Sequence, residues 1–351
     1  MDAQLTNTPA GENNSTPSWS VELTAKLTHL DSFELAIKLS GTGTVTIDWG
    51  DGTVLETFQM RELKTKYSNR KWCGTKYEHL YPLDTEVTYS VKISGQGGYL
   101  TLFNIEKGFL PNYDVFSVVL KHCDRLQYLY CGNNRLASLD VSQCTLLEEL
   151  YCFENQLKSL NISGCTQLKE LDCHENQLRS FNISECTQLK KLNCFSNRLT
   201  WLNVSHCTQL EELYCSGNEL PSLYIGQNPQ LKQLSCGDNE LTSLNVSKNL
   251  KLESLSCGSN PLSTLDVSPC TLLKDLACGE DRLTSLDISR NTQLRSLWYD
   301  CNPLSAEAMN QVYNDLPVVN QGEGKITINQ DTAGDHHIAE EKGWKVIIRY
   351  W

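Results

Sequence analysis

The chain has 351 residues, of which 42 are acidic and 30 are basic, so its formal net charge is −12. This acidic balance argues against a nucleic-acid backbone or an anionic membrane surface as the main partner. No run approaches the roughly 20 apolar residues that span a bilayer, so no membrane insertion is expected. At about 150 residues per domain, the length indicates two or three structural units.

Residues 1–18 are polar and rich in Pro, Asn, Ser and Thr. Such a composition cannot bury a core, and it predicts a flexible linker. The chain shows no apolar core after its N-terminus of the kind that forms a signal peptide. Two alternatives follow: a trimmed mature chain, with a lipid anchor before residue 1 as one means of attachment, or an intracellular protein.

Residues 19–104 have a strand-like pattern that alternates apolar and polar residues, and turn signals separate the strands. The segments are Trp19–Leu27, Phe33–Ser40, Val45–Trp49 and Thr88–Ile93. Gly50-Asp51-Gly52 indicates a hairpin turn. We expect Asp48 and Asp51 to form this turn rather than to hold a cation.

Three motifs in this region resemble polycystic-kidney-disease-type (PKD-like) β-sandwich domains. They are the T-V-T-I-D-W-G-D-G-T segment at 44–53, the H-x-Y segment at 79–81 and the Y-x-V-x-I-x-G segment at 89–95. The intervening stretch, Gln59–Tyr77, is longer and more basic than the family pattern. The resemblance implies an Ig-like sandwich over 19–104, of a type that usually serves as an extracellular spacer.

A 21-residue repeat begins after a degenerate copy at residues 105–125, which we interpret as an N-terminal cap repeat. Its pattern is L-x-x-L-x-C-x-x-N-x-L-x-x-L-(D/N)-(V/I)-S-x-(C/N)-x-x. Nine copies occupy residues 126–304, each starting at a leucine: Leu126, Leu147, Leu168, Leu189, Leu210, Leu231, Leu252, Leu273 and Leu294. One copy holds too few apolar residues for a core of its own, so stacking must bury the repeated columns.

This pattern resembles the leucine-rich repeat family, in the short 21-residue class of bacterial surface proteins. The resemblance implies a parallel β solenoid with a concave strand face. The L-(D/N)-(V/I)-S segment is expected to form a second extended piece. We therefore predict a mainly β fold: a solenoid of nine leucine-rich repeats, preceded by an Ig/PKD-like β-sandwich and closed by a small α+β C-terminal cap.

Asparagines form one column of the repeat, and their amides are suited to satisfy backbone groups left open after each strand. The column consists of Asn134, Asn155, Asn176, Asn197, Asn218, Asn239, Asn260 and Asn302, with Asp281 replacing one member.

Thirteen of the 16 cysteines fall into two further columns. The first is Cys131, Cys152, Cys173, Cys194, Cys215, Cys236, Cys257 and Cys278, and the second is Cys144, Cys165, Cys186, Cys207 and Cys270. A disulfide needs Cβ atoms about 3.8 Å apart, whereas stacked neighbours lie about 4.8 Å apart, and zinc needs converging ligands. We therefore favour buried thiols over disulfides or metal sites. Cys73, Cys123 and Cys301 lie outside the columns.

After the last repeat, residues 305–351 are expected to cover the exposed end of the solenoid. Ser305 is a typical N-cap before a helix, and Lys325–Asn329 and Lys345–Tyr350 have the pattern of strands. The ending Lys342-Gly343-Trp344 resembles that of surface leucine-rich proteins from anaerobic commensal bacteria. His336 and His337 suggest a metal site, but no carboxylate or cysteine spacing supports one, so we predict no metal and no cofactor.

No catalytic motif is present, and Cys173 and His174 should point to opposite faces of a strand. Binding is therefore expected at the variable positions of the concave face. Aromatic and acidic residues gather there in the first five repeats, whereas repeats six to eight carry small residues. The candidate binding residues are Tyr128, Tyr130, Glu149, Tyr151, Phe153, Glu170, Asp172, His174, Phe195, Glu212 and Tyr214. The alternative is that Phe153 and Phe195 only cover the solenoid edge.

These observations predict a non-enzymatic recognition or adhesion protein, extracellular or on the outer cell surface, and monomeric. Its concave face would bind a protein partner on a host or another surface. The alternative is a carbohydrate-binding surface protein, because aromatic rings among acids also suit a glycan. Fold alone does not decide between them.

Overall fold

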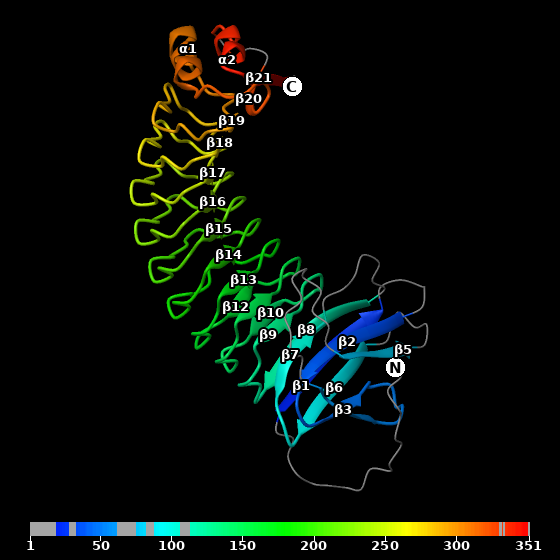
Figure 1. Cartoon of the computed structure of the whole chain (residues 1–351). Coiled ribbons are helices and arrows are strands. Elements are labelled where there is room, and N and C mark those ends of the chain that lie inside the picture. Colours follow the sequence, from blue (N-terminus) through cyan, green and yellow to red (C-terminus); the bar gives the residue numbers. More distant parts are fainter. Residues whose placement is uncertain are drawn as a thin grey trace.

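The computed structural model describes residues 19–27, 33–61, 75–81, 88–105, 113–329, 332 and 334–349. The expected linker at 1–18, Cys73 and most of the basic stretch after Gln59 lie outside these residues. Within them, one sheet runs from the N-terminal region to the C-terminal cap, and the chain forms an arc (Figure 1). No helix in the described ranges is long and apolar enough to cross a bilayer.

Eight strands form the N-terminal region, and the strand segments expected from alternation are confirmed. They are β1 (Trp19–Leu27), β2 (Phe33–Gly41), β3 (Thr44–Asp48), β4 (Glu56–Gln59), β5 (Thr75–Tyr81), β6 (Thr88–Gln96), β7 (Leu100–Asn104) and β8 (Tyr113–Lys121). One sheet has the order β4-β3-β6-β1-β8, and β5, β2 and β7 belong to the other. Alternate residues of β1, β3 and β6 are buried, as a half-covered sheet requires.

Asp48 and Asp51 form the turn after β3, as expected from the sequence. Asp48 Oδ1 accepts the Gly50 N–H at 2.9 Å, and Asp51 Oδ1 accepts the Thr53 N–H at 3.1 Å. The second oxygen of Asp51 lies 2.7 Å from Nε2 of His79. Both aspartates therefore order the loop between β3 and β4, which pair antiparallel.

The N-terminal region and the solenoid share strands. Strand β7 pairs in parallel with β9, placing Phe103 beside Leu129, so the sheet of β2 and β5 continues into the repeats. Strand β8, which lies within the expected cap repeat at 105–125, pairs antiparallel with β1. The cap repeat is thus also an edge strand of the N-terminal region.

Each repeat contributes one three-residue strand to the solenoid sheet. These are β9 (Tyr128–Tyr130), β11 (Glu149–Tyr151), β13 (Glu170–Asp172), β14 (Lys191–Asn193), β15 (Glu212–Tyr214), β16 (Gln233–Ser235), β17 (Ser254–Ser256), β18 (Asp275–Ala277) and β19 (Ser296–Trp298). They pair in parallel with a 21-residue offset, as in Leu150 opposite Leu171. The central leucine of every strand is buried. The expected second extended segment forms a ladder only between β10 (Ser138–Asp140) and β12 (Ser159–Asn161), with one further bridge at Asn203.

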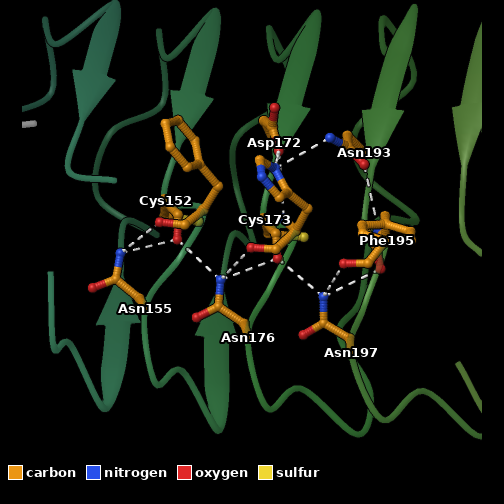
Figure 2. Close-up of polar contacts among 11 residues, drawn as sticks. Cys152, Asn155, Asp172, Cys173, Asn176, Asn193, Phe195 and Asn197 are labelled. Atoms are coloured by element: carbon orange, nitrogen blue, oxygen red, sulfur yellow. Dashed lines mark hydrogen bonds and ion pairs between the residues drawn. The ribbon is translucent and has the colours of Figure 1, made fainter. Parts of the chain in front are cut away.

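The asparagine column forms hydrogen bonds to backbone groups of successive repeats, as predicted (Figure 2). The amide nitrogen of Asn176 donates to the carbonyl oxygens of Cys152 at 3.0 Å and Cys173 at 3.1 Å. Its Oδ1 accepts the N–H of Leu157 at 2.9 Å. Since the side chain is buried, these bonds satisfy backbone groups that no water reaches.

The prediction of buried, unpaired thiols is confirmed: fifteen described cysteines are free, and all but Cys301 are buried. The second column is a donor position, because the Cys165 sulfur lies 3.4 Å from the carbonyl oxygen of Val141. Asn228 stands in that column and donates to the equivalent carbonyl, that of Val204, at 2.9 Å.

Cys123 is expected outside the columns, but it extends the second one. The N–H of Leu126 donates to the Cys123 carbonyl at 3.0 Å, the same turn bond that joins Leu147 to Cys144. This repeat diverges from the pattern and also supplies β8, but its cysteine keeps the place of the second column.

The C-terminal cap follows the predicted plan. It comprises α1 (Ala306–Asp315), β20 (Gly324–Asn329), α2 (His337–Glu341) and β21 (Trp344–Arg349). The Ser305 hydroxyl caps α1 by accepting the Ala308 N–H at 3.2 Å. Strand β20 pairs in parallel with β19, so Ile326 covers Leu297 and the last repeat is not left open.

Candidate binding face of repeats one to five

The candidate site lies on the sheet face that lines the inside of the arc (Figure 1). The third and fifth positions of a repeat flank the buried leucine of each strand, and most of their side chains are partly exposed. Because the parallel strands pair in register, equivalent side chains of neighbouring repeats lie about 4.8 Å apart, close to the stacking distance of aromatic rings. The repeat therefore favours aromatic stacks on this face.

The first stack joins Tyr130 and Tyr151, whose ring centroids are 5.0 Å apart with planes inclined by 17°. The Tyr130 hydroxyl donates to Glu149 at 2.8 Å, and the Tyr151 hydroxyl donates to Glu170 at 2.5 Å. Burial, followed by the charges and hydrogen bonds of these glutamates, raises the pKa of both tyrosines. Both rings are thus held as neutral hydrogen-bond donors.

A second stack joins Phe153 and His174, with centroids 4.9 Å apart and planes within 7°. Nδ1 of His174 lies 2.5 Å from Oδ1 of Asp172 and 3.2 Å from Nδ2 of Asn193. Burial lowers the pKa of His174, but the bond and charge of Asp172 outweigh it, and the pKa is raised overall. The imidazole is fixed on one side by a ring and on its edge by polar groups.

The fourth and fifth repeats present Phe195 and Tyr214. Phe195 is 42% exposed. The Tyr214 hydroxyl donates to Glu212 at 3.2 Å and also to Gln233. The ammonium of Lys191 lies 2.9 Å from Glu212 and 5.6 Å from the Tyr214 ring centroid. Lys191 thus neutralises the acid beside this tyrosine.

The predicted residues come together on one face, but they divide into two groups. Tyr130 and Glu149 are buried, each 4% exposed, so their role is to hold the ring of Tyr151 in place. Glu170, Asp172 and Glu212 are each bonded to a neighbouring side chain. The aromatic rings other than Tyr130, including the partly buried Tyr128, are at least partly exposed on this face. The acids position these rings.

The edge-covering alternative applies in part to Phe153. A Cβ at Gly132 would lie 2.8 Å from its ring, so the ring packs on that glycine. Glycines continue the same column in repeats six to eight, where a Cβ at Gly258 would lie 2.5 Å from the carbonyl oxygen of Gly279. The small residues there reflect close approach of neighbouring turns as well as the absence of rings.

Three features of the surface did not emerge from the repeat pattern. Lys191 and Asn193 join the site through their contacts with Glu212 and His174, which depend on side-chain reach. Arg349 of the C-terminal cap lies over the ring of Trp298 at 3.9 Å, a contact between segments distant in sequence.

A further pair of aromatics, Trp201 and Tyr224, is 56% and 71% exposed on the second segment of two adjacent repeats, away from the strands. The sequence does mark this pair, because Trp201 stands where most repeats have Ser and Tyr224 stands where they have Asp or Asn.

Cys173 and His174 lie on opposite sides of the chain, as expected, and cannot form a catalytic pair. Cys173 is fully buried, while His174 is partly exposed on the other side of the chain. Burial raises the pKa of the Cys173 thiol, which keeps it protonated.

At the C-terminal cap, the sequence indicated no carboxylate near His336 and His337, and this expectation is wrong. The turn of α2 places Glu340 2.9 Å from Nδ1 of His337.

No family model and no curated protein matches the chain. Solved structures match it. The functional domain of InlJ from Listeria monocytogenes, which includes a cysteine ladder, is 34% identical with a TM-score of 0.51, over 60% of this chain and 47% of that one. The chain therefore has the leucine-rich repeat fold.

A leucine-rich repeat protein from Leptospira interrogans shares the fold at 23% identity and a TM-score of 0.51. That match covers 58% of this chain and 61% of the other. The chain thus spans less than two thirds of the length of either relative. Its stacked cysteine columns give it a feature comparable to the ladder of InlJ.

Proposed function

We propose that this leucine-rich repeat protein is a non-enzymatic recognition protein that binds a protein partner through repeats one to five. The observation that carries the proposal is the row of rings held rigid on the concave face. Tyr151, Phe153, His174 and Tyr214 are each fixed by a stack or a hydrogen bond. Phe195 continues the column of Phe153 and His174 in the next repeat. Rigid, partly exposed aromatics lose little entropy on binding and are frequent binding hot spots.

The proposal includes the organisation and location of the chain. The units are a linker at 1–18, a PKD-like sandwich at 19–104 that acts as a spacer, the cap repeat at 105–125, the repeats at 126–304 and the C-terminal cap at 305–351. Similarity to InlJ supports a binding role on the leucine-rich repeat fold. We place the protein outside the cell or on its surface, as a monomer.

A protein partner is favoured over a glycan by the state of the acidic residues. Carbohydrate recognition relies on carboxylates and amides that bond sugar hydroxyls, but Glu149, Glu170 and Glu212 are bonded to tyrosine or lysine side chains. An apolar, ring-lined face is better suited to apolar side chains of a protein.

The test captures partners on the immobilised chain from an extract of surface-labelled host cells, with a glycan array run in parallel. The double variant Phe195→Ala/Tyr214→Ala should lose at least ten-fold of the captured protein and keep the melting temperature of the parent. The control, Trp201→Ala/Tyr224→Ala, removes two aromatics that are more exposed and lie elsewhere, and it should retain capture. Capture unaffected by the first variant would refute the proposed face, and glycan hits lost in that variant would favour the carbohydrate alternative.

A further inference from the structure

Three side chains of residue types that can bind metals lie close together on the concave face, between the second and third repeats. One ring nitrogen of His174 and one carboxylate oxygen each of Glu154 and Glu175 lie within 4.8 Å of one another. The glutamates are exposed and the histidine is partly buried. This group combines an imidazole with two carboxylates, a donor set suited to divalent transition metals.

The backbone brings the two glutamates together. Both occupy the eighth position of the repeat, where Glu154 has φ 48° and Glu175 has φ 50°. Their turns are joined by a bond from the Glu154 N–H to the His174 carbonyl at 2.9 Å. Equivalent residues on neighbouring strands repel when they carry like charge, so a cation between them is favourable.

The imidazole is oriented before any metal arrives. Its face stacks on Phe153, and Nδ1 lies 2.5 Å from Oδ1 of Asp172. Metal-binding histidines commonly donate one ring N–H to a carboxylate, which fixes the tautomer and leaves the other nitrogen to bind the metal. With Nδ1 engaged by Asp172, Nε2 is the nitrogen left for a ligand bond.

We propose that Glu154, His174 and Glu175 bind one zinc ion on the concave face, with Asp172 as the positioning residue of the imidazole. Three protein ligands leave a coordination position open, which water or a side chain of a partner would fill. Calcium and magnesium are disfavoured, because both prefer a set of oxygen ligands alone.

A second group with similar spacing is formed by His336, His337 and Glu340 at the start of α2. One of its members is partly buried and two are exposed, as in the first group. However, the Nδ1 contact of His337 is made by Glu340, a member of the group itself, whereas His174 is held by Asp172. We assign no site to it, but it must be removed for a clean measurement, as must the exposed thiol of Cys301.

The test is calorimetric titration of the full chain with zinc chloride alone, in a His337→Gln/Cys73→Ser/Cys301→Ser background. The background should bind one zinc ion per chain. His174→Gln should weaken binding at least 100-fold, and Asp172→Asn should weaken it 10- to 100-fold without changing the metal-free melting temperature. The matched control, His206→Gln, removes an exposed histidine outside the group and should leave zinc binding unchanged.

A second readout replaces zinc with cobalt, whose visible absorption bands report a nitrogen and oxygen ligand set. These bands should appear in the background and vanish in His174→Gln. Absence of zinc binding in the background, or equal affinity in His174→Gln, would overturn the proposal. Because no partner is present in either experiment, their failure would leave the proposed recognition face untouched.

Discussion

At the residue scale, the columns of the repeat separate two kinds of cysteine. Those of the first column, such as Cys194, have other thiols as their neighbours along the column, and burial raises their pKa. Those of the second, such as Cys207, lie near backbone carbonyls, and asparagine replaces them in three later repeats. One residue type therefore fills an apolar position and a donor position in the same repeat.

This difference predicts opposite outcomes for one substitution. Cys207→Asn should cost less than about 1 kcal/mol of unfolding free energy, because the new amide can donate to carbonyls as Asn228 does. Cys194→Asn should cost about 2–5 kcal/mol, because the amide would be buried among thiols. Urea unfolding of the two variants measures both, and equal losses would contradict the assignment.

Asp281 replaces an asparagine in the ladder and provides a test that depends on pH. Its Oδ1 accepts the N–H of Asn260 at 2.9 Å, whereas its buried Oδ2 has no hydrogen-bond partner. Burial raises the pKa of this carboxyl to about 7. Below that pH the folded state therefore holds the neutral acid, and the stability that this proton provides is lost as the pH rises from about 4 to about 7.

We therefore expect Asp281→Asn to stabilise the protein by about 1–3 kcal/mol at pH 8, because an amide is neutral at every pH and donates as the other asparagines do. The gain should shrink toward zero at pH 4, where the native carboxyl is protonated. Denaturation midpoints across this range provide the measurement. A gain that grows as the pH falls would show that Asp281 is ionised in the folded state.

At the scale of the element, the asparagine ladder sets the turn after each strand. Asn176→Ala would leave a buried N–H and buried carbonyls without partners and should destabilise the protein by about 2–4 kcal/mol. Asn182→Ala is the matched control in the same repeat, since it removes only an exposed bond to the Ser184 N–H and should cost about 0.5 kcal/mol. Similar melting temperatures for the two variants would argue against the ladder as a source of stability.

At the scale of the whole molecule, periodicity predicts the solenoid because every repeat obeys the same local rules. The positions of Leu150, Asn176 and Cys173 follow from the 21-residue offset alone. The junctions did not follow from it, because β8 pairs with β1, a strand some 90 residues earlier, as Thr24 and Ser117 show. Non-local pairing of this kind leaves no mark in a repeat pattern.

The candidate site was predictable in composition but not in detail. Variable positions placed the rings on one face, since strand alternation decides which side chains point outward. Burial of Tyr130 and the bond of Glu149 to its hydroxyl depend on packing beneath the face. The approach of Glu154 to His174 depends on the left-handed turn, which non-glycine residues such as Glu154 rarely adopt.

The central claim is that the concave face of repeats one to five meets a protein partner. A photo-crosslinking phenylalanine analogue at position 195 tests it most directly, with the same analogue at position 224 as the control on the other exposed segment. After irradiation with host-cell surface extract, a defined protein adduct should form at position 195 and not at position 224. Adducts at position 224 alone, or equal yields at both positions, would contradict the claim.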